Sequence, residues 1–162
     1  MQTAASPFLR LISHPVKARW FLFSRLPAAF FSGVRIRSVS AMQCTASVPY
    51  NWFTKNPFRS TYFACLSMAA EMSTGALAMA AVYGQAPAVS MLVTGMESKF
   101  LKKATGTTLF TCADGPLLQQ AVEQARTGSG PQVAKAYSKG VDAEGTMVAE
   151  FWFTWSFRVK AR

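Results

Sequence analysis

The most constraining feature of this 162-residue sequence is a run near its middle, residues 60–84 (STYFACLSMAAEMSTGALAMAAVYG), that contains no lysine or arginine. The run is dense in alanine, methionine and leucine, which are strong helix formers. Pro57 lies just ahead of it, and Ser60 or Thr61 could cap its first turn. Gly84 ends it. The composition therefore predicts one long helix that is apolar nearly all round.

A helix of this kind either crosses a bilayer or forms the enclosed centre of a globular fold. Glu71 lies at the middle of the run, with the hydroxyl side chains of Ser67, Ser73 and Thr74 close to it in sequence. A charged side chain at mid-membrane is costly, and the rest of the chain has the alternating pattern of strands. We therefore favour a core helix that is buried on most sides.

The strands around this helix are marked by alternation of apolar and polar side chains. The clearest strand is 146–160, where one face carries Met147, Ala149, Phe151, Phe153, Trp155, Phe157 and Val159. Further strands are expected at 34–39 and 42–48 before the helix, and at 88–103, 107–112 and 132–139 after it. Gly95 allows a bulge or bend in the first strand of the second group.

A second, shorter helix is expected at 114–127, with Asp114 as its N-cap. The order is then two strands, a long helix, and four strands with one short helix inserted. Together these elements predict a single α+β domain, in which a curved antiparallel sheet of about six strands wraps the long central helix.

The charge distribution favours an anionic partner. The net charge is +10, and residues 1–70 contain no acid, so the first carboxylate of the chain is that of Glu71. Nucleic acid, an anionic membrane surface and a phosphorylated small molecule such as coenzyme A would all be attracted. Basic and aromatic side chains of 146–160 fall on opposite faces of the expected strand, whereas nucleic-acid modules expose both on one surface. We therefore expect no nucleic-acid partner.

The N-terminal residues 6–26 combine leucines, aromatics and spaced basic residues, and Pro15 interrupts any helix there. Phe8, Leu11 and Ile12 would share one helix face. Such a segment allows membrane contact, and it also resembles an organellar transit peptide. The alternative, which we favour, is a helical segment (residues 1–27) that lies across the sheet or the substrate channel of a domain formed by residues 28–162.

The sequence excludes several kinds of catalytic site. His14 is the only histidine, which removes most histidine-based catalysis and any histidine-rich zinc site. Cys44, Cys65 and Cys112 show no CxxC spacing. We therefore expect reduced and mostly buried thiols, no bound metal and a cytoplasmic location.

Glu71 is the strongest catalytic candidate. It is the only acid between Met1 and Met96, and it lies in an apolar helix, where burial would raise its pKa and make it a usable base near neutral pH. Ser67 and Thr74 lie on the same helix face, where they could orient the carboxyl group or hold a water. The alternative is a structural glutamate that is hydrogen-bonded to one of these hydroxyls.

Three stretches resemble the hotdog-fold acyl-CoA thioesterases: NPFRSTYFACLSMAAEMSTGALA (56–78), VSMLVTGMESKFLKKATGTTLFTCADG (89–115) and VAEFWFTWSFRVK (148–160). Together they are similar to an uncharacterised branch of that superfamily, a domain of unknown function related to the phenylacetate-pathway type of thioesterase. The resemblance covers roughly residues 28–160. It implies a hotdog fold, a homodimer or dimer of dimers, and acyl-CoA bound in a groove at the dimer interface, with no cofactor beyond the coenzyme A of the substrate.

In the related enzymes a carboxylate on the central helix acts as general base or nucleophile. The start of that helix, often with a His-Gly-Gly motif, offers a backbone N–H to the thioester carbonyl oxygen. Glu71 matches the carboxylate, and Tyr62, Phe63 and Ala64 stand where the motif would be. Backbone N–H groups remain there for an oxyanion site, although a phenylalanine hinders close approach of the thioester more than a glycine would.

Four further residues could bind the substrate. Asn56 could contact the thioester or a water, and Arg59 could meet a phosphate at the positive end of the helix. Lys102 and Lys103 end an expected strand near a turn, where they could meet the phosphates of coenzyme A. Ordinary capping and solvation are the alternatives for all four. The resemblance thus implies an acyl-CoA thioesterase-like hydrolase, or else a non-catalytic hotdog domain that binds acyl-CoA or a fatty acyl chain.

Overall fold

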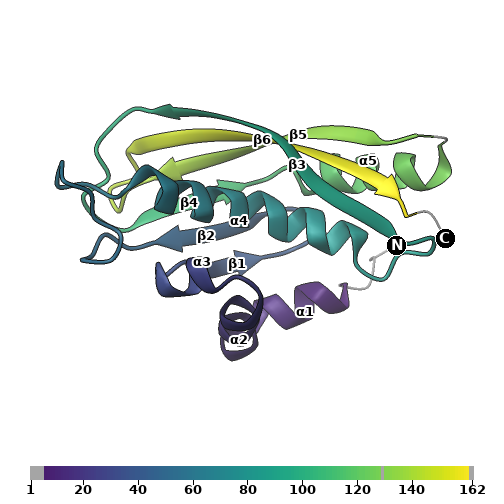
Figure 1. Ribbon diagram of the computed structural model, residues 1–162, viewed down its shortest axis with the longest axis horizontal. Coiled ribbons are helices and arrows are strands. Elements are labelled where there is room, and N and C mark those ends of the chain that lie inside the picture. Colours follow the sequence, from purple (N-terminus) through teal and green to yellow (C-terminus); the bar gives the residue numbers. More distant parts are fainter. Residues whose placement is uncertain (1–5, 129, 161–162) are drawn as a thin grey trace.

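The structure is a computed structural model that describes residues 6–128 and 130–160. One long helix lies across a face of a curved sheet (Figure 1). The elements follow the chain in the order α1 (Pro7–Ser13), α2 (Pro15–Arg25), α3 (Pro27–Phe31), β1 (Arg35–Val39), β2 (Cys44–Val48), α4 (Phe63–Val82), β3 (Val89–Phe100), β4 (Thr108–Cys112), α5 (Gly115–Thr127), β5 (Gln132–Val141) and β6 (Met147–Val159).

The sheet has six antiparallel strands in the order β1-β2-β4-β5-β6-β3. The two longest strands, β3 and β6, pair from Val89 opposite Val159 to Phe100 opposite Ala149. Their register shifts between Val93 and Gly95, where the bulge was expected. β3 forms one edge of the sheet, and its outer side has no partner strand within the described residues. The predicted α+β hotdog fold, a long helix wrapped by about six strands, is confirmed.

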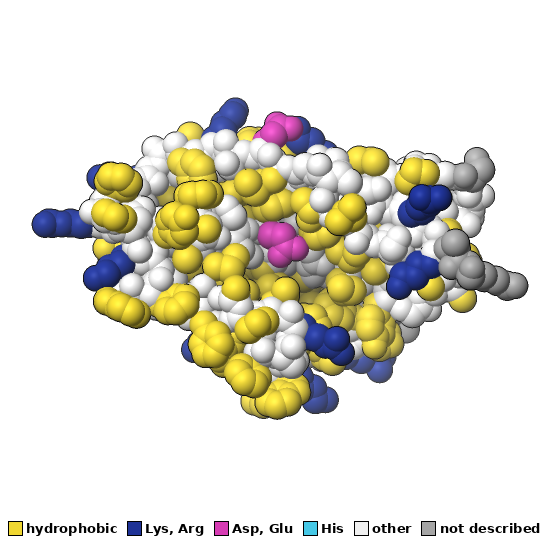
Figure 2. Space-filling view, in the orientation of Figure 1, with side chains coloured by type: hydrophobic (Ala, Val, Ile, Leu, Met, Phe, Trp, Pro, Cys, Tyr) yellow, Lys and Arg dark blue, Asp and Glu magenta, His cyan; other side chains and the backbone are white. Residues whose placement is uncertain are grey.

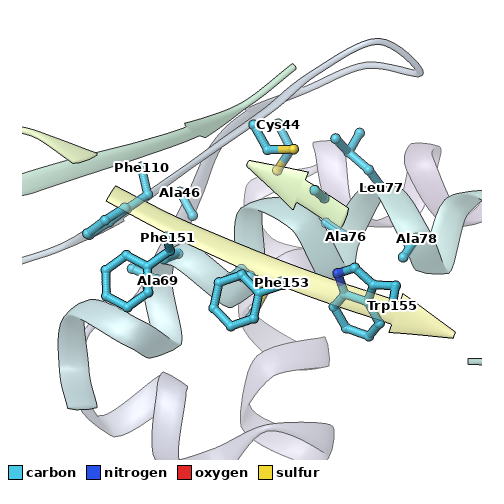
Figure 3. Close-up of a cluster of buried hydrophobic side chains, with 14 of the residues drawn as sticks. Cys44, Ala46, Ala69, Ala76, Leu77, Ala78, Phe110, Phe151, Phe153 and Trp155 are labelled. Atoms are coloured by element: carbon cyan, nitrogen blue, oxygen red, sulfur yellow. The ribbon is translucent and has the colours of Figure 1, made fainter. Parts of the chain in front are cut away.

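Small side chains let α4 lie close to the sheet. Figure 3 shows large side chains of β6 (Phe151, Phe153 and Trp155) near alanines of α4, including Ala69 and Ala76. All of these side chains are buried, so the apolar run meets an apolar sheet face. By length and composition alone α4 could also cross a membrane, but 67% of its most apolar window is buried inside the molecule.

The prediction that Ser60 or Thr61 caps α4 is wrong. The helix begins at Phe63, and its N-cap residue, Tyr62, makes no side-chain capping bond. Ser60 Oγ instead donates to Asn56 Oδ1 (3.2 Å), and Thr61 Oγ1 donates to the carbonyl of Ala104 (3.2 Å). Both hydroxyls therefore hold the loop before α4 in place, the second by tying it to the segment after β3.

The short helix α5 begins after Asp114, as expected, but the aspartate does not cap it through its side chain. Its Oδ2 accepts a hydrogen bond from the backbone N–H of Tyr137 in β5 (2.7 Å). The buried face of α5 is formed by Leu118, Ala121, Val122 and Ala125. The carboxylate therefore joins the start of α5 to the sheet.

Three helices precede the first strand, and a proline stands at the start of each: Pro7, Pro15 and Pro27. Proline suits this position because its fixed φ is helical and the N–H that it lacks would have had no partner within the helix. α1 buries Phe8, Leu9 and Ile12 in the main core. These helices lie beside β1 and α4 in Figure 1, so the N-terminal segment contributes to the same hydrophobic core as the sheet.

Candidate functional site

Glu71 lines an apolar cavity of about 390 Å³. The cavity lies between α4, the edge strand β3 and the N-terminal helices. Its walls include Phe8 and Ile12 of α1, Phe21 of α2, Met91 and Val93 of β3, and Trp155 of β6. Figure 2 shows one acidic side chain near the centre of this face, surrounded by hydrophobic side chains.

The Glu71 carboxyl group has neither a hydrogen bond nor an ion pair within residues 6–128 and 130–160. Burial in the apolar surroundings raises its pKa from 4.5 to about 7. At neutral pH the group is therefore divided between its acid and its carboxylate. A general base acts as the carboxylate, and a pKa near the working pH is the value that suits such a base.

The two hydroxyl residues next to Glu71 do not contact its carboxyl group. Ser67 Oγ donates to the carbonyl of Phe63 (2.9 Å), and Thr74 Oγ1 donates to the backbone carbonyl of Glu71 (3.1 Å). Thr74 Oγ1 also accepts a hydrogen bond from Trp155 Nε1 (3.1 Å). Both hydroxyls are thus bonded to the helix backbone, which corresponds to a packing role and leaves the carboxyl group free.

Gly75 makes room for the carboxyl group, and sequence reasoning missed it. A Cβ atom at this position would lie 2.6 Å from Glu71 Oε1 and 3.3 Å from Trp155 Cζ2. The carboxyl group is therefore folded back over the bare backbone one turn further along α4. A glycine in a run of strong helix formers, four residues after the only acid of that run, was the available signal.

We expect Gly75→Ala to keep the fold but to displace the carboxyl group of Glu71. The added methyl group clashes mainly with the end of a flexible side chain, while alanine favours the helix over glycine by about 1 kcal/mol. The thermal unfolding midpoint should therefore stay close to the wild-type value while the pKa of Glu71 changes, as measured by a carboxyl NMR titration. Gly106→Ala, a substitution into open space, is the matched control. An unchanged Glu71 titration in Gly75→Ala would contradict this role.

A second cavity, of about 550 Å³, lies at the start of α4 and the end of β3. It collects most of the other residues predicted to bind substrate: Asn56, Tyr62, Phe63, Lys102 and Lys103. Tyr62 and Phe63 are about half exposed, and their rings contact each other edge to face. The cavity is therefore an aromatic hollow with two lysines at its rim, and Glu71 is not among its lining residues.

Asn56 organises the loop before α4. Its Oδ1 accepts hydrogen bonds from the N–H groups of Phe58 (3.0 Å) and Ser60 (3.1 Å) and from the Ser60 hydroxyl. Only its amide nitrogen remains available for a ligand, apart from a long contact (3.5 Å) to the carbonyl of Thr61. Its predicted role in catalysis stays a prediction. Arg59 is exposed, with a φ of 59°, and lines neither cavity.

The two lysines at the rim differ in their contacts. Lys102 Nζ forms an ion pair with Asp142 Oδ2 (2.7 Å), whereas Lys103 Nζ makes only a long contact (3.5 Å) with the carbonyl of Phe58. An anion at this rim would therefore compete with Asp142 for Lys102. Lys103 is the more available cation, because no acidic group within the described chain pairs with it.

The start of α4 offers two free backbone donors. The N–H groups of Phe63 and Ala64 are in the first turn, where no intrahelical acceptor exists, and no other acceptor for them occurs in the described structure. Glu71 lies eight residues after Phe63, which corresponds to about 12 Å along the helix at about 1.5 Å per residue. One thioester cannot contact both groups of the same helix, because each must come within hydrogen-bond distance of the reacting atoms.

The thiols are unsuited to nucleophilic catalysis. Cys44, Cys65 and Cys112 are buried and free. Burial raises the pKa of Cys44 and of Cys112 to about 12, and it also raises that of Cys65. No cluster of three or more potential metal ligands occurs among the residues that the structure describes. Glu71 therefore remains the candidate for a chemical role, in the first of the two cavities.

Solved structures similar to this chain share its fold. A protein of unknown function and probable thioesterase from Pseudomonas aeruginosa has 20% sequence identity and a TM-score of 0.75, covering 93% of this chain and 99% of its own. The PaaI protein of the E. coli phenylacetic acid degradation operon has 15% identity and a TM-score of 0.64, covering 93% and 97%. A mutant thioesterase from Pseudomonas aeruginosa has 13% identity and a TM-score of 0.67, covering 93% and 98%.

A search of curated protein sequences gave no significant match. A family model described as a domain of unknown function, DUF4442, matches residues 19–157, which is most of the chain. The match begins within α2 and ends in β6, so it includes α4, all of the sheet except the last two residues of β6, and the lining of both cavities except Phe8 and Ile12. The chain therefore belongs to the DUF4442 family, and its fold is that of the hotdog thioesterase superfamily.

Proposed function

We propose that this protein is an acyl-CoA thioesterase-like hydrolase, with Glu71 as its general base. The observation that carries the proposal is the Glu71 carboxyl group itself. It has no partner in the described structure, faces an apolar cavity of about 390 Å³, and has a pKa near 7. A half-buried carboxyl group without a partner in apolar surroundings costs stability, so a role in chemistry accounts for it better than a role in packing.

The proposal requires two protomers, because the free N–H groups and the carboxyl group of one α4 are too far apart. The exposed edge of β3 is the natural place for the second protomer, since no strand of the described residues pairs with its backbone on that side. Exposed apolar side chains follow the same strand: Leu92, Met96, Phe100 and, just after it, Leu101. Antiparallel pairing of two β3 strands would continue the sheet and cover them.

Such pairing would join the two kinds of cavity. Met91 and Val93, near one end of β3, line the Glu71 cavity, and Phe100, at the other end, lines the second cavity. A two-fold axis near Gly95 places each end of one strand opposite the other end of its partner. The Glu71 cavity of one protomer then meets the aromatic cavity of the other, so each of two composite sites receives a base and a set of backbone donors.

In the proposed reaction the Glu71 carboxylate takes a proton from a water, whose oxygen attacks the thioester carbonyl carbon. The carbonyl oxygen becomes an oxyanion, which the N–H groups of Phe63 and Ala64 stabilise at the positive end of α4. When the tetrahedral intermediate collapses, the carbon–sulfur bond breaks. The thiolate of coenzyme A leaves with the proton held by Glu71, and the products are a free acid and the thiol.

The surroundings of the two cavities suit the two parts of an acyl-CoA. The walls of the Glu71 cavity are almost entirely apolar, as an acyl chain requires. Lys103, and Lys102 after release from Asp142, would meet phosphates at the rim of the other cavity. We propose no further cofactor.

The test is hydrolysis of a panel of acyl-CoAs of different chain length. The rate is measured by the appearance of the free thiol. We expect wild-type protein to hydrolyse at least one of them and Glu71→Ala to lose roughly 100-fold or more in kcat/KM, since general base catalysis typically contributes about this much. Binding of a non-hydrolysable acyl-CoA analogue, measured by calorimetry, should be retained by the variant. Hydrolysis at the wild-type rate by Glu71→Ala would contradict the proposal.

The second candidate is a non-catalytic hotdog domain that binds acyl-CoA or a fatty acyl chain. Phe63 favours it, because its side chain stands at the helix start where the related enzymes often have glycine, and it is about half exposed. The same panel separates the two functions. Wild type and Glu71→Ala would then bind the analogue equally well, and neither would hydrolyse any member of the panel.

A further inference from the structure

Helix α2 has a second apolar face that the fold does not use. Its inner face buries Ala18 and Leu22. On its outer side Val16, Trp20 and Phe23 follow at spacings of four and three residues, which place them on one face. Their exposed fractions are 71%, 68% and 45%. For a helix already anchored on its other side, such exposure is not explained by packing.

The outer face continues onto α3. Phe31 is 58% exposed, and its ring contacts that of Phe23 with centroids 6.4 Å apart; the rings of Trp20 and Phe23 lie 5.7 Å apart. We call Val16, Trp20, Phe23 and Phe31 the outer aromatic face. In Figure 2 hydrophobic side chains gather at the lower edge of the molecule, where Figure 1 shows α2, with basic side chains close by.

The charges that helices α1–α3 carry have one sign. Arg10 of α1 and Lys17 and Arg25 of α2 are exposed, and helices α1–α3 contain no aspartate or glutamate. Arg19 differs, because it donates to the carbonyl of Val34 (3.1 Å) and lies 3.9 Å from the ring centroid of Phe30. The surface that α1–α3 present is therefore aromatic and cationic, and these helices add no acid to it.

This combination fits an anionic bilayer surface better than a protein or a nucleic acid. Tryptophan and phenylalanine insert at the level of the lipid headgroups, while flanking lysine and arginine pair with anionic lipids. Side chains of the outer aromatic face, apart from the indole N–H, offer no hydrogen bonds with which to select a protein partner. We propose that α2 and α3 dock this protein on anionic membranes through the outer aromatic face.

The position of the outer aromatic face also bears on how an acyl substrate reaches the Glu71 cavity. This step rests on the function proposed above. The N-terminal segment also lines the Glu71 cavity, through Phe8 and Ile12 of α1, Phe21 of α2, and Leu26 between α2 and α3. Docking would hold this apolar cavity one helix layer from the bilayer surface. An acyl group that partitions into the membrane would then reach the cavity without crossing bulk water.

The docking itself can be tested without any assay of hydrolysis. Full-length protein is floated with vesicles of phosphatidylcholine alone and with vesicles that contain about one third phosphatidylserine, at low and high salt. We expect at least about tenfold stronger binding to the anionic vesicles, and loss of that difference at high salt. The double variant Trp20→Ser/Phe23→Ser should bind about tenfold more weakly than wild type, as should Lys17→Glu/Arg25→Glu.

The matched control is Trp52→Ser/Phe53→Ser, which removes the same two kinds of side chain from an exposed loop (79% and 55% exposed) and should bind like wild type. Thermal unfolding checks that all variants are folded. Equal flotation of wild type and Trp20→Ser/Phe23→Ser, or no preference for anionic vesicles, would overturn the proposal. A further overturning result is sedimentation velocity showing that the Trp20→Ser/Phe23→Ser substitutions dissociate an oligomer, since the face would then be covered by a second copy.

Discussion

At pH 8 the Glu71→Gln variant should be more stable than the wild type, by about 2 kcal/mol in the free energy of unfolding, while its hydrolysis of acyl-CoA falls by about 100-fold or more. Burial raises the pKa of Glu71 from 4.5 to about 7, so folding favours the protonated form. At pH 8 the wild type must keep a charged carboxylate in an apolar cavity. Glutamine keeps the shape of the side chain and removes its charge. The same substitution therefore raises the free energy of unfolding and removes the general base.

The expected pH dependence follows from the direction of this shift. A carboxyl group whose pKa is higher in the folded state contributes stability below its unfolded pKa, and that contribution is lost as the pH rises. Wild-type stability should therefore fall between about pH 4.5 and pH 7 relative to Glu71→Gln and stay level above that range. The expected difference is less than the full shift would give, because the side chain is only half-buried. Hydrolysis should rise with pH over the upper part of the same range, since the carboxylate is the active form.

The measurement is urea unfolding of wild type and Glu71→Gln at pH 5 and pH 8, with Glu144→Gln, a substitution of an exposed turn residue, as the control. The stability difference should be small at pH 5 and appear at pH 8 for Glu71→Gln alone. If the two variants show the same pH dependence, the carboxyl group of Glu71 is solvated, and the base assigned to the reaction lacks the expected pKa.

The central helix and its acid could be predicted from the sequence because each depends on local composition. A long apolar run with one charge can be read without knowing what surrounds it, and the strand 146–160 likewise shows its buried face by alternation alone. The start of α4 was misplaced because Ser60 and Thr61 are good capping residues by type. Their hydroxyls are bonded elsewhere, to Asn56 and Ala104, and the second of these contacts joins residues 43 positions apart.

The parts of the site that escaped prediction depend on contacts between distant segments. Gly75 matters because the Glu71 carboxyl group folds back over it beside Trp155, which belongs to the last strand. Phe8 and Ile12 line the cavity because α1 returns to α4 across the fold. Lys102 was expected to be free for a phosphate, and its pair Asp142 comes from the turn between β5 and β6. The sequence shows which chemical group each of these residues carries. It does not show which residues from distant segments contact that group.

Phe63→Pro should lower hydrolysis by about 100-fold or more while leaving the protein folded. Phe63 is the first residue of α4, where proline is favoured, and its N–H has no acceptor in the described structure. The preceding residue, Tyr62, has φ −61° and ψ 132°, an extended conformation that tolerates a following proline. The substitution therefore removes one oxyanion donor, and the loss of such a donor typically costs about 100-fold or more in kcat. Phe63→Ala keeps the N–H and removes the same ring, so it should retain activity.

Phe63→Pro and Glu71→Gln together decide whether one site needs two chains. Each variant alone should be inactive, because every composite site would lack either the donor or the base. When the two are unfolded together and refolded as an equimolar mixture, about half of the dimers should be mixed, and each mixed dimer should contain one intact site out of two. The mixture should therefore regain about one quarter of wild-type activity. A mixture that forms mixed dimers, shown by differently tagged chains, yet stays inactive would place the base and the donors in the same protomer, in conflict with the distance of about 12 Å between them along α4.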